Sequence, residues 1–348
     1  MDRFLLFLCL PFVCLLDACS ADIDLYADYK QVPIIYGLLD ANADTNFVKI
    51  TRAFYVQGDA YQVAQNPDSS NYPGKLDVRL VEYCNEDSIR EILLDTITIQ
   101  NKEQGVFYAP SQKLYHTAEP LCMNGADKKY SYRLKIDFGD HTLVTEADMV
   151  GNGGFDVQSL AVNFSKEYFN SIPRRFLFRP AINAGFYQVS LAFTFLEQRT
   201  PDSDSISRTM YWDLGYWNES ALSTHTDEGC YVFFYRPEVF YEMLQEFIGG
   251  DTMISGLRRY ITDYPVEVCI TAGGEKLRQY VYNNNTSNGF SQGDAEFSLI
   301  DGSYGVFSSR MTIRHAVRLA GETVPELVAE RKWGFKFIGG QDPTLADQ

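Results

Sequence analysis

The stretch that decides the fold class is KLDVRLVE at residues 75–82, in which apolar and polar side chains alternate. Alternation with a period of two places one set of side chains on the buried face of a sheet and the other set in solvent. This stretch is therefore predicted to be a half-buried β-strand.

Other segments of the first half are also rich in β-branched, aromatic or other apolar residues, and most of them alternate in the same way. Such segments are typical of strands. The predicted strands are 33–39, 47–54, 76–83, 91–99, 130–138 and 142–149. Short strands separated by turn-rich segments favour a β-sandwich.

The second half mixes strands with short helices. Its predicted strands are 186–197, 207–214 and 265–271, and its predicted helices are 238–248, 275–282 and 324–330. A polar turn at 201–204 joins the first two strands, and residues 283–293 are expected to form a polar loop. The whole chain is predicted to be mainly β, with a second β-rich α+β domain.

A glycine-rich break at residues 150–154 separates the two halves. Glycine removes side-chain constraints on the backbone, so such a segment is a natural junction. The part of the chain after the predicted signal peptide has about 330 residues, which is more than a single hydrophobic core usually serves. We therefore expect a first domain at 19–150 and a second at 155–348, after a signal peptide at 1–18.

The N-terminus has the layout of a signal peptide. Arg3 is followed by an apolar run at residues 4–16 that ends at Asp17. A transmembrane helix needs about 20 apolar residues, so this run is too short to span a bilayer. Export is the predicted outcome.

Leu16, Ala18 and Cys19 resemble a bacterial lipobox, although Asp17 departs from its usual pattern. In such a motif the Cys19 thiol carries the lipid, which predicts an anchor on the outer membrane. Acidic residues within 20–24 resemble the signal that sends Bacteroidota lipoproteins to the cell surface. The alternatives are a periplasm-facing anchor, or an ordinary secretory signal that leaves Cys19 without a role.

Composition indicates a folded, acidic protein. Hydrophobic residues make up 45% of the chain and aromatic residues 14%, which excludes disorder. The formal net charge is −16, and Lys and Arg are nowhere clustered beyond a pair. Nucleic acid is therefore an improbable partner.

Four cysteines follow Cys19, and an oxidising compartment would allow them to form two disulfides. Proximity in the sequence favours Cys84 with Cys122 and Cys230 with Cys269, and the alternative is four free thiols. None of these cysteines has CxxC spacing, so neither a zinc site nor a redox motif is expected.

Signatures of catalysis and metal binding are missing from the sequence. It contains no HExxH, GxSxG, GxGxxG or phosphate-loop motif. Residues 40–46, DANADTN, match the opening of a calcium loop, but Thr45 replaces the required glycine and Thr51 replaces the bidentate glutamate. A polar hairpin loop explains these residues better, so we predict no catalytic residues, metal or cofactor.

Four aromatic residues could form a stacking platform for sugars or peptides: Tyr211, Trp212, Tyr216 and Trp217. Packing in the core is the alternative for these rings. Four tripeptides also resemble the Asp-Ser/Thr-apolar acceptor for O-glycans in exported Bacteroidota proteins. Their hydroxyl residues are Ser88, Thr96, Ser205 and Thr252.

Three segments together resemble the Bacteroidota lipoproteins of domain-of-unknown-function family 4249. They are IIYGLL at 34–39, FVKITRAF at 47–54 and DGSYGVFSS at 301–309. The resemblance implies an outer-membrane lipoprotein with an immunoglobulin-like N-terminal domain, often found alongside TonB-dependent transporters. It implies no active site.

These observations favour a non-enzymatic surface binding or accessory protein that captures a peptide or glycan, with an outer-membrane transporter as its expected partner. A structural component of envelope assembly is the second hypothesis, and an unrecognised hydrolase is the third.

Overall fold

The computed structural model describes residues 32–54, 59–171, 173–218, 229–249, 256–286 and 298–337. Within these ranges the chain is mainly β, as predicted, and the described residues belong to one unit. No helix in the described part of the chain is both long enough and apolar enough to cross a membrane.

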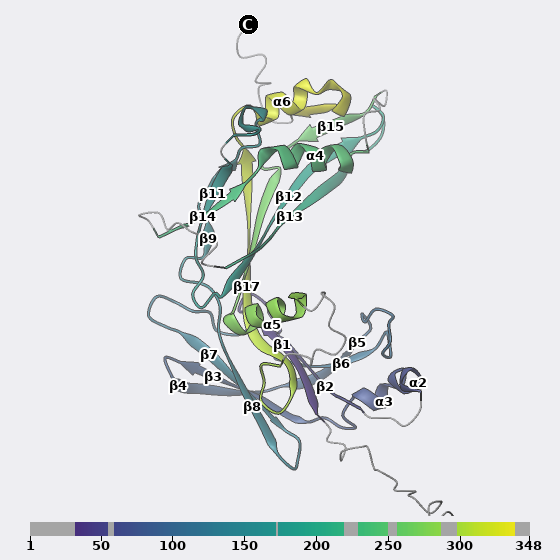
Figure 1. Ribbon diagram of the computed structural model, residues 1–348, viewed down its shortest axis with the longest axis vertical. Coiled ribbons are helices and arrows are strands. Elements are labelled where there is room, and N and C mark those ends of the chain that lie inside the picture. Colours follow the sequence, from purple (N-terminus) through teal and green to yellow (C-terminus); the bar gives the residue numbers. More distant parts are fainter. Residues whose placement is uncertain are drawn as a thin grey trace, which may run out of the picture. The chain divides into compact units, whose positions relative to one another are not determined.

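Residues of the first half build two sheets that enclose one hydrophobic core (Figure 1). One is the end of an 11-stranded sheet that continues through β17 (Tyr304–Leu319), and it contains β1 (Pro33–Leu39), β2 (Phe47–Arg52), β6 (Gln112–His116) and β5 (Asp95–Ile99). The other contains β3 (Asp77–Cys84), β4 (Asp87–Leu93), β7 (Tyr130–Asp137) and β8 (Thr142–Asp148). The immunoglobulin-like assignment stays a prediction.

Alternation decides which side chains enter this core. In β1, Ile35 and Leu39 are fully buried, whereas Ile34 and Tyr36 lie on the opposite face of the sheet. Because side chains of a strand point alternately to its two faces, one sequence supplies both a core face and an outer face.

One predicted strand is wrong. Residues 91–99 form two strands rather than one, because the chain leaves the β3–β4 pair after Leu93 and joins β6 with β5. Leu94, between the two strands, is buried in the core. A strand that changes sheets keeps its apolar character throughout, so the sequence pattern does not reveal the break.

β17 was not predicted, and it links the two halves of the chain. Its first residues pair in parallel with β1, and its later residues pair antiparallel with β16 (Val266–Gly273). Phe307 consequently belongs to the core of the first half, although it lies far along the sequence. The predicted domain boundary at 150–154 stays a prediction. Met149 packs in the core of the first half, whereas Val150 packs in a second hydrophobic core.

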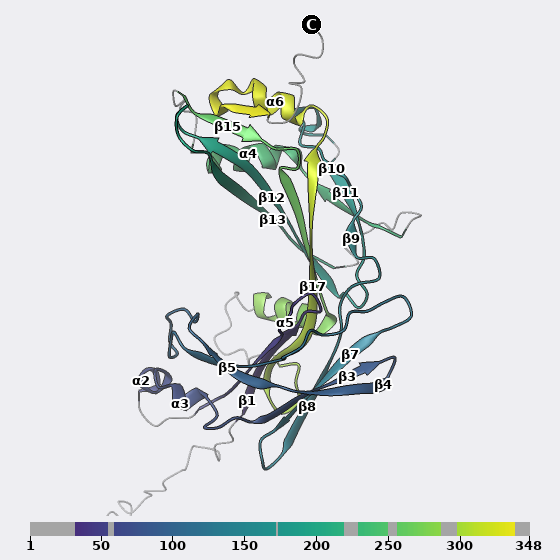
Figure 2. The same cartoon turned by 180° about the vertical axis from the view of Figure 1, so that it is seen from behind.

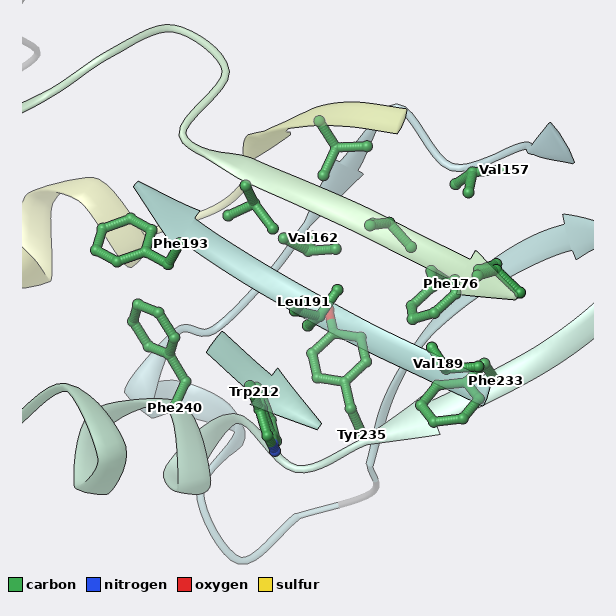
Figure 3. Close-up of a cluster of buried hydrophobic side chains, with 14 of the residues drawn as sticks. Val157, Val162, Phe176, Val189, Leu191, Phe193, Trp212, Phe233, Tyr235 and Phe240 are labelled. Carbon is green, nitrogen blue, oxygen red and sulfur yellow. The ribbon is translucent and has the colours of Figure 1, made fainter. Parts of the chain in front are cut away.

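The second core lies between further strands and helices (Figures 2 and 3). The strands are β9 (Asp156–Val157), β10 (Ala161–Val162), β11 (Arg174–Arg179), β12 (Phe186–Gln198), β13 (Ile206–Trp217), β14 (Tyr231–Tyr235), β15 (Arg258–Ile261), β16 and β18 (Phe335–Phe337). The helices are α4 (Pro237–Phe247), α6 (Thr323–Ala329) and the 3-10 turns Lys166–Tyr168 and Arg331–Trp333. Helix α5 (Glu275–Thr286) contacts β17, and none of its described residues belongs to this core. Two short helices, α2 (Ala60–Ala64) and α3 (Pro67–Ser70), belong to the first half.

The helix predicted at 238–248 is confirmed as α4. Pro237 occupies its first turn, where the missing N–H costs no hydrogen bond. Phe240 and Leu244 lie one turn apart and are buried, and the Phe240 ring stacks on Phe164 with centroids 4.2 Å apart. As predicted, the helix covers a sheet through its apolar face.

Candidate functional site

A pocket of about 290 Å³, lined mostly by aromatic side chains, lies where β12, the end of β13 and α5 meet. We call it the aromatic pocket. It is lined by Phe186, Tyr216, Trp217, Asn218, Arg278, Val281 and Tyr282. Tyr216 and Tyr282 are 54% and 64% exposed, so ring faces are open to solvent at this position.

A β-bulge in β13 places the aromatic residues of this pocket. Gln188 of β12 lies opposite Tyr216, whereas Ser190 lies opposite Asp213, so β13 contains one extra residue between these pairs. Gly215, with φ +87°, lies in this bulge, and its N–H donates to the Asp213 carboxylate over 2.9 Å. A one-residue shift exchanges the faces to which all later side chains point.

The shift decides the orientations of Tyr216 and Trp217. Tyr216 lies on the outer face, and its ring centroid is 5.8 Å from that of Phe186. Trp217 turns toward the core, where its ring meets Phe233 edge-on at 5.1 Å and its indole N–H donates to the Leu214 carbonyl. With strict alternation the two residues would exchange places.

The structure therefore divides the predicted aromatic platform. Trp212 is only 7% exposed and packs in the second core, so its ring presents no surface for a ligand. Tyr211 is 72% exposed and lies opposite Ala192, four residues along β12 from Gln188. At about 3.3 Å per residue, Tyr211 lies roughly 13 Å from the pocket along the same face.

Sequence analysis did not select Phe186, Arg278 or Tyr282 as site residues. They come from a predicted strand and a predicted helix that are distant in sequence, so only the fold brings them beside Tyr216. For the bulge that places Tyr216, the sequence does offer a signal. Gly215 directly follows the predicted strand 207–214, and an isolated glycine in an apolar strand often marks a bulge.

A charged pair borders the pocket on α5. Arg278 Nε donates to Glu275 Oε2 over 2.7 Å. The hydrogen bond from Arg278 lowers the pKa of the Glu275 carboxyl below its usual range. The guanidinium is thus held in place beside the aromatic rings and presents further N–H donors at the rim.

The predicted disulfides are not formed, because Cys84, Cys122 and Cys269 are free thiols and each predicted pair contains at least one of them. Cys230 is buried, whereas Cys269 lies between Ser190 and Arg314 on the outer face of its sheet, so these two side chains do not meet.

Cys122 lies near the carboxylate of Glu82. Burial raises the pKa of the Cys122 thiol, and the negative charge of Glu82 raises it further. A thiol that resists ionisation is a poor partner in disulfide exchange. This environment gives a physical reason for the free state of Cys122.

The predicted glycan acceptors differ in exposure. Ser88 and Ser205 are exposed, whereas Thr96 is half-buried within β5. Thr252 lies outside the described residues. Glycosylation therefore stays a prediction, for which Ser88 and Ser205 meet the requirement of an accessible hydroxyl.

The loop at residues 40–46 is a polar hairpin loop between β1 and β2, as expected. The Asp40 N–H donates to Asn46 Oδ1 over 2.6 Å, and Asn46 Nδ2 donates back to the Asp40 carbonyl. Asn46 is thus used as a turn residue. In the described part of the chain, no group of three His, Cys, Asp or Glu residues is placed to hold a metal ion.

Comparison of the sequence with protein-family models and with curated proteins gives no match. The resemblance to family 4249 stays a prediction. Cys19, the predicted lipid attachment residue, lies outside the described residues.

Proposed function

We propose that this chain is a lipid-anchored surface binding protein that holds a peptide or glycan in the aromatic pocket without converting it. The observation that carries the proposal is the bulge in β13, which brings Tyr216 to the solvent face beside Phe186 and under α5. Exposed rings in a concave site with a few polar groups at the rim are the usual composition of a ligand pocket.

The chemistry of the lining favours binding over catalysis. Hydrolysis needs a general base, a nucleophile or a metal within reach of the bound ligand. The described residues that line the pocket supply aromatic rings, one amide and one guanidinium. Such groups stack on a ring and donate hydrogen bonds to its substituents.

A direct test measures ligand binding by the full-length chain purified in detergent. Arrays of peptides and glycans select a ligand, and calorimetry measures its affinity. Tyr216→Ala is expected to lower the affinity at least tenfold, because an aromatic contact is removed from the pocket. Tyr211→Ala removes a more exposed ring on the same face outside the pocket and should leave the affinity unchanged.

Equal losses in both variants would contradict the assignment of the pocket. Conversion of the selected ligand by the wild type would show an enzyme instead and would overturn the proposal. Sugar rings and aromatic peptide side chains both present a flat face to the pocket, so both ligand classes are tested. The array distinguishes them because it contains peptides and glycans as separate members.

The proposed accessory role depends on Cys19 and on a membrane partner. Affinity purification of the intact protein from detergent-solubilised envelopes should recover an outer-membrane transporter with the wild type. The Cys19→Ala variant is expected to lose the anchor and that partner together. A stoichiometric partner that is recovered equally with Tyr216→Ala would assign the partner to a surface away from the pocket.

A further inference from the structure

A second pocket, of about 350 Å³, lies on the outer face of β1 and β2, and we call it the basic pocket. Ile34 lies opposite Thr51 and Tyr36 lies opposite Lys49 across the two strands, and all four side chains line it. Helix α3 contacts β2, and Figure 1 shows α2 and α3 beside this strand. This pocket is distinct from the aromatic pocket, which lies on β12, β13 and α5.

Positive charge is concentrated in the basic pocket. Its lining includes Lys49, Arg52, Lys102 and Lys113, and no Asp or Glu is among the described lining residues. The chain as a whole carries a formal charge of −16. In so acidic a chain, randomly placed carboxylates would be expected beside these cations. Their absence from the described lining therefore indicates a functional reason for the positive charge.

The lysines are held by neutral groups rather than by carboxylates. Lys49 Nζ donates to Gln112 Oε1 over 3.1 Å, and Lys102 Nζ donates to the Tyr108 carbonyl over 2.7 Å. Lys113 Nζ donates to the Gly74 carbonyl over 2.9 Å. Each ammonium has three N–H donors, so these contacts position Lys49 and Lys102 and leave further donors for a ligand.

The arrangement carries an electrostatic cost. Burial lowers the pKa of the Lys49 ammonium below its usual range, and the positive charge of Lys102 lowers it further. Two partly buried cations near each other repel, and a bound anion would offset both the repulsion and the lost hydration.

We infer that the basic pocket binds a small molecule through a phosphate- or sulfate-ester group, with its organic part against the rings of Tyr36 and Phe107. The cations come from separate segments, with Lys49 on β2 and Lys102 after β5, and both line the pocket. This placement suits a tetrahedral, negatively charged group with several acceptor oxygens. The Phe107 ring lies 5.5 Å from Lys102 Nζ, so apolar surface and charge are adjacent.

The test uses calorimetry on the full-length chain in detergent with phenyl phosphate, phenyl sulfate, inorganic phosphate and benzoate as probes. We expect phenyl phosphate or phenyl sulfate to bind more tightly than benzoate, with an affinity that falls as salt concentration rises. The stronger of the two esters identifies the source of the oxyanion. Absence of binding to both esters at low salt would overturn the inference, and so would equal or tighter binding of benzoate.

Matched variants localise the binding. Lys49→Gln and Lys102→Gln should each lower the affinity for the better ester at least tenfold, while thermal unfolding shows that the fold is retained. Lys75→Gln is the control, because Lys75 is an exposed lysine paired with Asp95 and is not among the described lining residues of the pocket. Equal loss with the control would contradict the site.

The Tyr216→Ala variant separates this inference from the proposed function. It should leave ester binding unchanged, since Tyr216 lines only the aromatic pocket. Failure of the aromatic pocket to bind peptides or glycans therefore leaves the result for the basic pocket intact.

Discussion

Phe186 on β12 lies directly opposite Gly273 on β16, and its ring fills the space that a Cβ at position 273 would occupy. The ring also contacts Tyr216 and forms one wall of the aromatic pocket. The glycine at the end of β16 thus gives an aromatic side chain room to lie close to the backbone.

Gly273→Ala is therefore expected to displace Phe186 and to lower the free energy of unfolding by about 1–3 kcal/mol, as overpacking does. Ligand affinity in the aromatic pocket should fall with it. Urea unfolding measures the first effect and calorimetry the second. Gly105→Ala is the control, because nothing lies within 4 Å of a Cβ built there. Similar losses at both positions would contradict the role of Gly273.

A buried ion pair stabilises the second half of the chain. Arg259 Nε donates to Glu197 Oε2 over 3.0 Å, and the two side chains are 5% and 3% exposed. Burial lowers the pKa of the Arg259 guanidinium, and the bond to Glu197 opposes that shift.

Glu197→Ala leaves the Arg259 charge buried without its carboxylate, so we expect a loss of about 3–5 kcal/mol in the free energy of unfolding. The exposed pair of Arg79 and Glu91 is the comparison, with side chains 45% and 39% exposed. Glu91→Ala should cost at most about 1 kcal/mol. Chemical denaturation of both variants measures the difference, and equal costs would show that burial of the Glu197 pair has no effect.

Tyr235 is expected to make the fold sensitive to alkali. Its hydroxyl accepts from the Asn163 N–H over 2.9 Å, and burial raises its pKa to about 12. A phenol with a raised folded-state pKa contributes stability that is fully present below the unfolded value near 10. That contribution is lost as pH rises from about 10 to 12, and it amounts to roughly 2–3 kcal/mol.

Tyr235→Phe tests this expectation. At pH 7 the variant should be less stable by about 1 kcal/mol, because the Asn163 N–H loses its acceptor. Between pH 10 and 12 the wild type should lose stability faster than the variant, so the difference shrinks or reverses. Denaturation curves measured across this range decide the matter, and parallel pH profiles would show that Tyr235 does not titrate with folding.

Thiol titration checks the state of the cysteines. Each single Cys→Ser variant at Cys84, Cys122 and Cys269 should lose one titratable thiol in denaturant, because these three thiols are free. If two of these cysteines formed a disulfide, substitution of one would release the thiol of the other. The number of titratable thiols would then rise by one. The measurement separates the free-thiol structure from the pairing predicted by sequence proximity.

Most strands of the first half were predictable, because alternation is a local property that a single segment displays. β1 at Pro33–Leu39 agrees with its predicted range, and β7 and β8 differ from theirs by one residue at the end. The break at Leu94 was missed, since its cause is the change of partner from β3 to β6. The sequence of a strand does not show which other strand it pairs with.

The aromatic pocket was predicted in part. Four rings were selected, of which Tyr211 and Tyr216 are exposed, Trp212 is buried and Trp217 turns toward the core. The face of β13 assigned by its pairing with β12 decides between Tyr211 and Trp212, and the bulge between the Gln188 and Ser190 pairs decides between Tyr216 and Trp217.

By itself the sequence determined what depends on neighbouring residues: the mainly β class, the positions of most strands, and α4. The tertiary structure alone decided what depends on pairing between distant segments. It placed Phe307 in the first core, set Phe186 against Gly273, and brought Lys49 and Lys102 to one pocket. The physical reason is that side-chain periodicity is local, whereas strand partners and register are set by contacts across the fold.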